Sequence, residues 1–187
     1  MTINNQLLSI GGYAPPVAEI SRSGLKSVQV FDSSSAHGGA GHVTHTWTKP
    51  GGVTMIRVQV QGSGASGNTS GKSGGAGGYS EKIIDVTNIV SETVTTGNRE
   101  SGHNNSGHTS SFGSHLSATG GYNNSNNKSP YAGTDGGHGG IGTGGDINSN
   151  GGGGNSAKAS DGGFAGAASY FGGGSSGQNT SNKGSHP

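Results

Sequence analysis

Histidine is the most numerous potential metal ligand in this 187-residue chain, which has eight histidines and no cysteine. Six of them fall in two clusters: His37, His42, His45, His103, His108 and His115. Imidazole rings bind zinc and related metals when several of them converge on one point. His42 and His45 are three positions apart in an expected strand, so their rings point to opposite faces and do not converge. We expect no metal site within one chain, and the open alternative is a site shared between subunits on an assembly axis.

The tripeptide Gly71-Lys72-Ser73 is similar to the end of a phosphate-binding loop, whose backbone amides surround a nucleotide's phosphates. That loop also requires a glycine at position 66, which here is Ser66, and a helix after the serine. Asp and Glu number nine together and show no carboxylate pair or Ser/His/Asp order typical of catalysis. We therefore expect a non-enzyme with no cofactor and no catalytic residue.

Ringed side chains that stand alone among small polar residues are the best candidates for binding. They are Tyr122, Tyr131, His138, Tyr170 and Phe171. Planar rings hold a sugar or an exposed protein loop because they offer apolar faces and lose little entropy. We predict receptor binding by Tyr122, Tyr131, His138 and Tyr170. The alternative is that such rings fill a sparse core, and for Phe171 this alternative is favoured.

Short segments rich in β-branched and aromatic residues are expected to position these rings. They are residues 28–31, 43–48, 53–61, 79–86, 92–96 and 111–119, separated by Gly, Asn, Pro and Ser. In 53–61, Ile56, Val58 and Val60 alternate with polar residues, which predicts a strand with one buried face. Trp47 is assigned to the core, and no window has the apolar repeat of a helix. The sequence predicts an all-β protein, a small β-sandwich with glycine-rich loops and almost no helix.

Glycine recurs every three residues at positions 133, 136, 139, 142 and 145. Three residues make one turn of the left-handed polyproline II helix, so these glycines give such a helix one bare face. Backbone amides and carbonyls are then free to bond to a neighbouring chain segment. The spacing predicts a bundle of polyglycine II helices, with fragments of the repeat at 71, 74 and 77 and at 151 and 154. The alternative is a flexible Gly/Ser linker.

Composition divides the chain into three regions and excludes several classes of partner. Glycine supplies 42 residues, charged residues are 10% and the formal net charge is +1, so no basic surface for nucleic acid is expected. The first residues contain neither a basic start nor a long apolar run, so no signal peptide is expected. We expect an extended N-terminal arm over 1–23, a β-sandwich domain over 24–121 and a glycine-rich distal region over 122–187.

The order of motifs between 28 and 121 resembles the glycine-rich domain of tailed-bacteriophage tail fibres and related virion adhesins. The motifs are Val28-Gln-Val-Phe31, Thr46-Trp-Thr-Lys-Pro-Gly-Gly-Val-Thr-Met-Ile-Arg-Val-Gln-Val-Gln61, Gly77-Gly-Tyr-Ser-Glu-Lys-Ile-Ile-Asp-Val-Thr87 and Ser110-Ser-Phe-Gly-Ser-His-Leu-Ser-Ala-Thr-Gly-Gly121. The resemblance implies a virion tail protein, made in the host cytoplasm, that docks on other tail proteins through 1–23. It also implies a homotrimer that binds a host surface glycan or outer-membrane protein.

Two other functions follow from the same features. The first is a structural decoration or connector protein of the virion that binds no receptor. The second is an ice-binding polyglycine bundle, which would need flat repeated faces of Thr or Ala that this sequence lacks.

Overall fold

The computed structural model describes residues 27–33, 41–67, 72–98, 104–123, 136–155 and 167–171. The chain divides into two compact units, Met1–Val30 and Phe31–Pro187. In the first unit only 27–30 are described, and the arm predicted over 1–23 lies outside the described residues. Residues 28–31 have no ladder partner, so the strand predicted there is wrong. Val28 and Val30 are exposed, and Phe31, in the second unit, packs against that unit's core.

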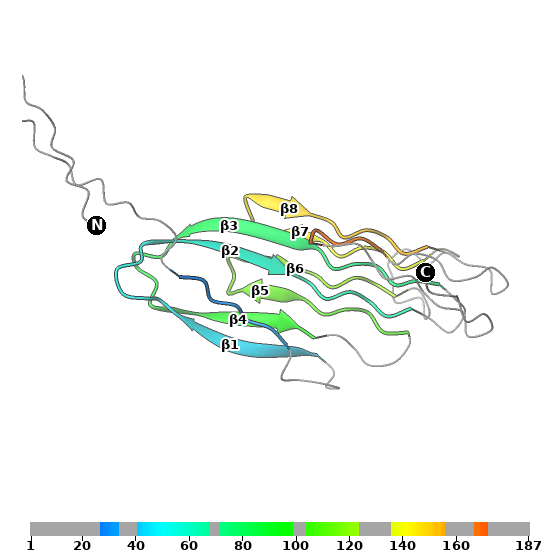
Figure 1. Cartoon of the computed structure of the whole chain (residues 1–187), viewed down its shortest axis with the longest axis horizontal. Helices are drawn as coiled ribbons and strands as arrows, with labels where there is room; N and C mark the ends of the chain where they lie inside the picture. Colours follow the sequence, from blue (N-terminus) through cyan, green and yellow to red (C-terminus); the bar gives the residue numbers. More distant parts are fainter. Residues whose placement is uncertain are drawn as a thin grey trace, which may run out of the picture. The chain divides into compact units, whose positions relative to one another are not determined.

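In the described residues of the second unit, eight strands form two antiparallel sheets (Figure 1). They are β1 (His42–Thr48), β2 (Met55–Gln61), β3 (Tyr79–Asp85), β4 (Ser91–Gly97), β5 (Ser110–Phe112), β6 (Leu116–Ala118), β7 (Gly142–Thr143) and β8 (Ile147–Ser149). The larger sheet has the order β1-β4-β5-β6-β7 and the smaller one β2-β3-β8. No helix occurs in the described part of the chain, and consequently none that could span a membrane. The all-β prediction is confirmed.

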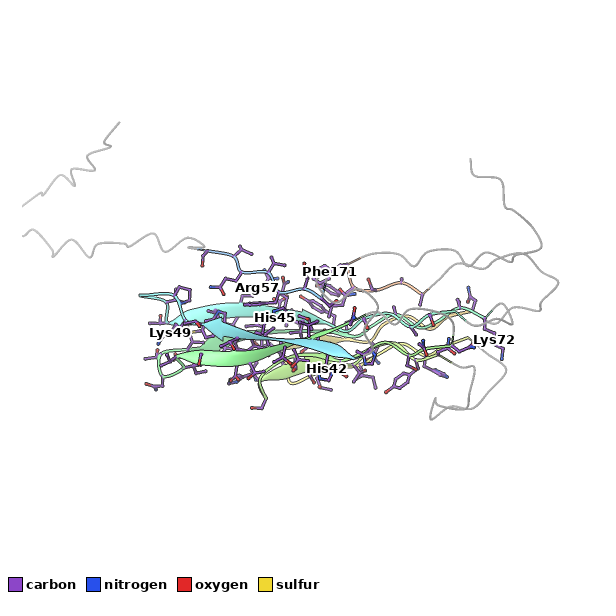
Figure 2. All side chains as sticks on the ribbon, turned by 90° about the horizontal axis from the view of Figure 1, so that it is seen from below. His42, His45, Lys49, Arg57, Lys72 and Phe171 are labelled. Carbon is purple, nitrogen blue, oxygen red and sulfur yellow. The ribbon has the colours of Figure 1, made fainter. Side chains whose placement is uncertain are left out.

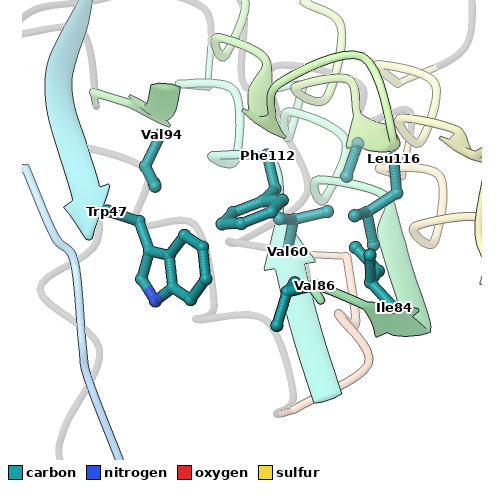
Figure 3. Close-up of a cluster of buried hydrophobic side chains, with 8 residues drawn as sticks. Trp47, Val60, Ile84, Val86, Val94, Phe112 and Leu116 are labelled. Carbon is teal, nitrogen blue, oxygen red and sulfur yellow. The ribbon is translucent and has the colours of Figure 1, made fainter. Parts of the chain in front are cut away.

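The hydrophobic core lies between the two sheets. Trp47 and Phe112 of the larger sheet meet edge to face at 5.5 Å between ring centroids, and Val60 and Ile84 face them from the smaller sheet (Figure 3). Trp47 is buried as predicted. The alternation predicted for β2 is also confirmed, because its Val60 is buried while the residues between the core positions are exposed or half-buried.

Side chains between the two layers become smaller along the strands. Near one end they are Trp47 and Phe112. Near the other end they are Ala118 and Ser80, which are completely buried and lie where the strands adjoin the glycine-rich chain. Beyond these residues the layers are joined by backbone hydrogen bonds, such as Gly78 N–H to the Thr119 carbonyl at 3.0 Å. The loss of side-chain volume allows the two layers to approach each other.

Six chain segments continue the strands and form what we call the glycine bundle. Segments 104–109, 119–123 and 136–141 (row 1) adjoin β5, β6 and β7, and segments 62–67, 72–78 and 150–155 (row 2) adjoin β2, β3 and β8. Bonds repeat every three residues: Gly75 and Gly78 donate to Tyr122 and Thr119, as Gly137 and Gly140 donate to Ser73 and Ala76. Three residues are the repeat of a polyglycine II helix, so the bonding has the predicted period.

The bare face predicted for the glycine repeat at 133–145 is present in its described part. A methyl group added at Gly136 or Gly139 would overlap the backbone of Gly154 or Gly151. Gly142 is equally close to the backbone of Tyr79. Gly133, at the start of the repeat, lies outside the described residues. The sequence therefore located one of the faces through which this segment packs, and Gly137 and Gly140 form a second one, against the backbone of Tyr122 and Thr119.

The predicted boundary at residue 121 is not a boundary in the structure. Strand β7 pairs with β6, with Ser117 opposite Thr143, and β8 pairs with β3, with Tyr79 opposite Ser149. Residues from beyond 121 therefore complete both sheets and belong to the same compact unit, Phe31–Pro187. Sequence patterns missed these strands because they are held by backbone pairing and carry almost no buried apolar side chain.

Candidate binding sites

The structure divides the predicted receptor-binding residues between two places. Tyr122 and His138 are neighbours in row 1, where the Tyr122 N–H donates to the His138 carbonyl at 2.8 Å, and both are half-buried. Tyr170 stacks instead on Tyr79 of β3, in the smaller sheet. Tyr131 lies outside the described residues. The four residues therefore do not form one site in the described part of the chain.

Three aromatic rings, which we call the ring cluster, meet on the outer face of the smaller sheet. Tyr79 and Tyr170 are parallel within 2° with centroids 3.8 Å apart. Phe171 stands perpendicular to both, 5.1 Å from Tyr79 and 5.2 Å from Tyr170. Segment 167–171 is held beside row 2 by a bond of 2.8 Å from Gly152 N–H to the Ala168 carbonyl.

Exposure differs sharply within the ring cluster. Tyr79 is 1% exposed, whereas Tyr170 is 51% and Phe171 62% exposed. The interpretation that Phe171 fills a core is therefore wrong. The cluster consists of one buried ring that supports two accessible ones.

A polar network fixes the buried ring through its hydroxyl group. Glu81 accepts hydrogen bonds from Arg57 Nε at 2.7 Å and Nη2 at 2.9 Å, from Gln59 Nε2 at 3.0 Å and from the Tyr79 hydroxyl at 2.5 Å. These bonds, that from Arg57 above all, lower the pKa of Glu81 to about 2. Burial, followed by the bond to Glu81, raises the pKa of Tyr79 to about 12. At neutral pH Glu81 is ionised and Tyr79 is protonated, so the network holds its donors and acceptors in fixed states.

The network went unnoticed in the sequence, although a signal for it exists. Tyr79 and Glu81 are two positions apart on one strand, and β2 places Gln59 opposite Glu81. Alternation therefore puts all three on one face of the sheet. The same outer face carries the exposed side chains of Met55 and Ile83. Figure 2 labels Arg57 of this network and Phe171 of the ring cluster.

One end of the glycine bundle gathers the ends of the described segments, and we call it the pole (Figure 1). These ends are Gly67, Lys72, Asn104, Asn123, Gly136 and Asn155. Asn104 N–H donates to Gly67 at 3.1 Å, Ser73 N–H donates to Asn155 at 3.1 Å, and the Asn123 side-chain amide donates to Ser66. The segments of row 1 and row 2 are therefore hydrogen-bonded to one another up to the pole.

Two histidines of the described residues make local contacts within the larger sheet and the segment beside it. His45 Nε2 lies 3.0 Å from the Asp32 carbonyl and 3.3 Å from Thr96 Oγ1, and its ring contacts Phe31. His115 Nε2 lies 3.3 Å from Glu92 Oε2. Within the described ranges no three His, Asp or Glu side chains are grouped so that they could hold a metal ion.

Comparisons of the chain with protein-family models, with curated proteins and with solved structures gave no match.

Proposed function

We propose that this chain is a non-catalytic virion tail-fibre or adhesin subunit that attaches to the particle and binds the surface of a host cell. The order of motifs between 28 and 121 supports the class of protein. The pole is the single observation that carries the binding role. A bundle joined by backbone bonds brings several chain ends to one place, as expected of a scaffold that presents variable residues to a partner.

Segments 68–71 and 124–135 each connect two chain ends at the pole, segment 156–166 begins there, and all three lie outside the described residues. In the proposal these segments, which include Tyr131, contact the host glycan or outer-membrane protein. Residues 1–23 dock the subunit on other tail proteins, and the subunits form a homotrimer.

Adsorption of the purified protein to bacteria tests the proposal. We expect the protein to adsorb to a susceptible strain and to block infection by the phage that carries it. Replacing 125–130 by a Gly/Ser sequence of equal length should reduce adsorption at least tenfold while the melting temperature stays unchanged. Val90→Ala is the matched control, because Val90 is exposed and lies in the turn between β3 and β4, at the end of these strands away from the bundle.

A decoration or connector protein is the second candidate. The exposed apolar side chains of Met55 and Ile83 favour it, because such residues mark surfaces that other protein chains cover. A protein of this kind should neither adsorb to cells nor block infection, and it should bind assembled particles instead. That pair of results would contradict the adhesin proposal.

A further inference from the structure

We propose that the ring cluster, together with Arg57 and Gln59, is a saccharide-binding surface that takes a neutral pyranose. This inference rests on the proposed surface-binding function for its biological role, and it assigns a chemical class of ligand to one site. The site is on the smaller sheet and is separate from the pole.

The first support is a preformed apolar corner. Tyr79 covers one face of Tyr170, so the other face of Tyr170 is the accessible one, and half of that residue is exposed. Phe171 stands at 89° to Tyr170 and forms the side of the corner. The C–H face of a pyranose packs on such a ring, and a ring already fixed by stacking loses little entropy on binding.

The second support is a set of planar polar groups beside the rings. Arg57 uses Nε and Nη2 to bind Glu81, while its side chain is 61% exposed, so the Nη1 side of the guanidinium is available to a ligand. Gln59 Nε2 donates to the Tyr79 hydroxyl at 2.8 Å, which fixes the amide at the edge of the same ring. Sugar hydroxyls both donate and accept, and fixed planar groups recognise them well.

The third support is charge, which selects a neutral ligand. The Arg57 guanidinium is paired with the Glu81 carboxylate, so the site carries no net charge from these two residues. An acidic sugar or a phosphate would have to compete with Glu81 for Arg57. A neutral sugar leaves the ion pair intact and needs only the remaining donors.

The sequence that follows the ring cluster is poor in apolar residues. Residues 172–187 contain no Ala, Val, Leu, Ile, Met, Phe, Tyr or Trp. A second copy of the protein is the other possible occupant, and the experiment below includes it as an outcome that contradicts the proposal.

Saturation-transfer NMR on the full chain tests the proposal, with glucose, galactose and N-acetylglucosamine as probes and glucuronate as the acidic comparator. We expect saturable binding of at least one neutral probe, and weaker binding of glucuronate. Tyr170→Ala should lower the affinity at least tenfold. Ile83→Ala, which removes another exposed side chain from the same face, should leave it unchanged.

Three outcomes would overturn the inference. They are no saturable binding of any neutral probe, unchanged binding in Tyr170→Ala, and a concentration-dependent dimer that Tyr170→Ala dissociates. Failure of this inference and failure of the proposed function are distinguishable. A protein that adsorbs to cells but binds no probe contradicts only the inference, and one that binds a probe but does not adsorb contradicts only the proposed function.

Discussion

The sandwich and the glycine bundle are built from the same continuous chain segments, yet they hold two layers together by different means. In the sandwich, side chains such as Trp47, Phe112 and Val60 fill the space between the sheets. In the bundle, backbone amides of one row donate directly to carbonyls of the other, as Gly75 donates to Tyr122. Apolar burial stabilises the first half, and close backbone bonding stabilises the second.

This difference predicts opposite sensitivities to mutation. A side-chain core tolerates swaps of similar volume, because neighbouring side chains repack. A bundle of contacting backbones has no side chain to repack, so one added methyl group forces two segments apart. Conversely, residues that point out of the bundle do not contribute to its packing and are free to vary.

The largest effect is expected in the sandwich core. Phe112→Ala removes a buried ring that packs on Trp47 and should lower the free energy of unfolding by about 3–5 kcal/mol. Urea denaturation followed by Trp47 fluorescence measures this loss. Phe112→Leu, which keeps much of the volume, should cost clearly less, and equal losses in the two variants would contradict a side-chain core.

A methyl group at the row contact should have the next largest effect. In Gly139→Ala the new methyl overlaps the Gly151 carbonyl, so the segments must separate and the bonds from Gly151 and Gly154 weaken. With about 1 kcal/mol for each bond and added strain, we expect a loss of about 2–4 kcal/mol. Amide hydrogen exchange should show lost protection in the bundle. Uniformly fast exchange in the unmodified protein would indicate a flexible linker instead.

A smaller effect on stability is expected when the pH is lowered, because the network that supports the ring cluster contains the ionised Glu81. The folded pKa of Glu81, about 2, is below its ordinary value of 4.5, so its stabilising contribution is present above pH 4.5 and is lost between pH 4.5 and 2. Melting temperature should therefore fall more steeply in this range for the unmodified protein than for Glu81→Gln. Parallel curves for the two proteins would contradict the role given to Glu81.

The smallest effect, a gain in stability, is expected at a glycine that has room for a methyl group. A methyl group at Gly153 would meet only the Gly137 carbonyl, at 3.6 Å, an ordinary contact. Gly153→Ala should stabilise the protein by about 0.4–1 kcal/mol, because alanine has fewer conformations in the unfolded chain. Calorimetry of Gly153→Ala and Gly139→Ala compares their effects on stability. A similar loss of stability in both variants would mean that contacts between the rows do not decide where a methyl group is tolerated.

Sequence patterns predicted the parts of the fold that depend on local signals. Alternation located β2, composition located its neighbouring strands, and the spacing of Gly136, Gly139 and Gly142 located a face of close backbone contact. The segment 28–31 has strand composition but no ladder partner, because composition alone does not supply a neighbour.

The sequence could not predict which distant segments lie side by side, for a physical reason. Glycine has no side chain that could specify which backbone lies next to it, so nothing in the sequence pairs segment 136–141 with 150–155. The stacking of Tyr170 on Tyr79 likewise joins residues far apart in the chain. Tyr170 and Phe171 were therefore predicted only as isolated rings. Their contact with Tyr79 and the support of that ring by Glu81 and Arg57 were not predicted.

The direct continuation of strands into the bundle also determines how the protein bears mechanical load. Bonds between the rows run across the chain direction, and each segment lies along it. A pull applied along this direction at the pole loads these bonds in shear, so that many must fail together. A pull across one segment would break them one after another. The unit is therefore strongest along the line that leads from the pole to the sandwich.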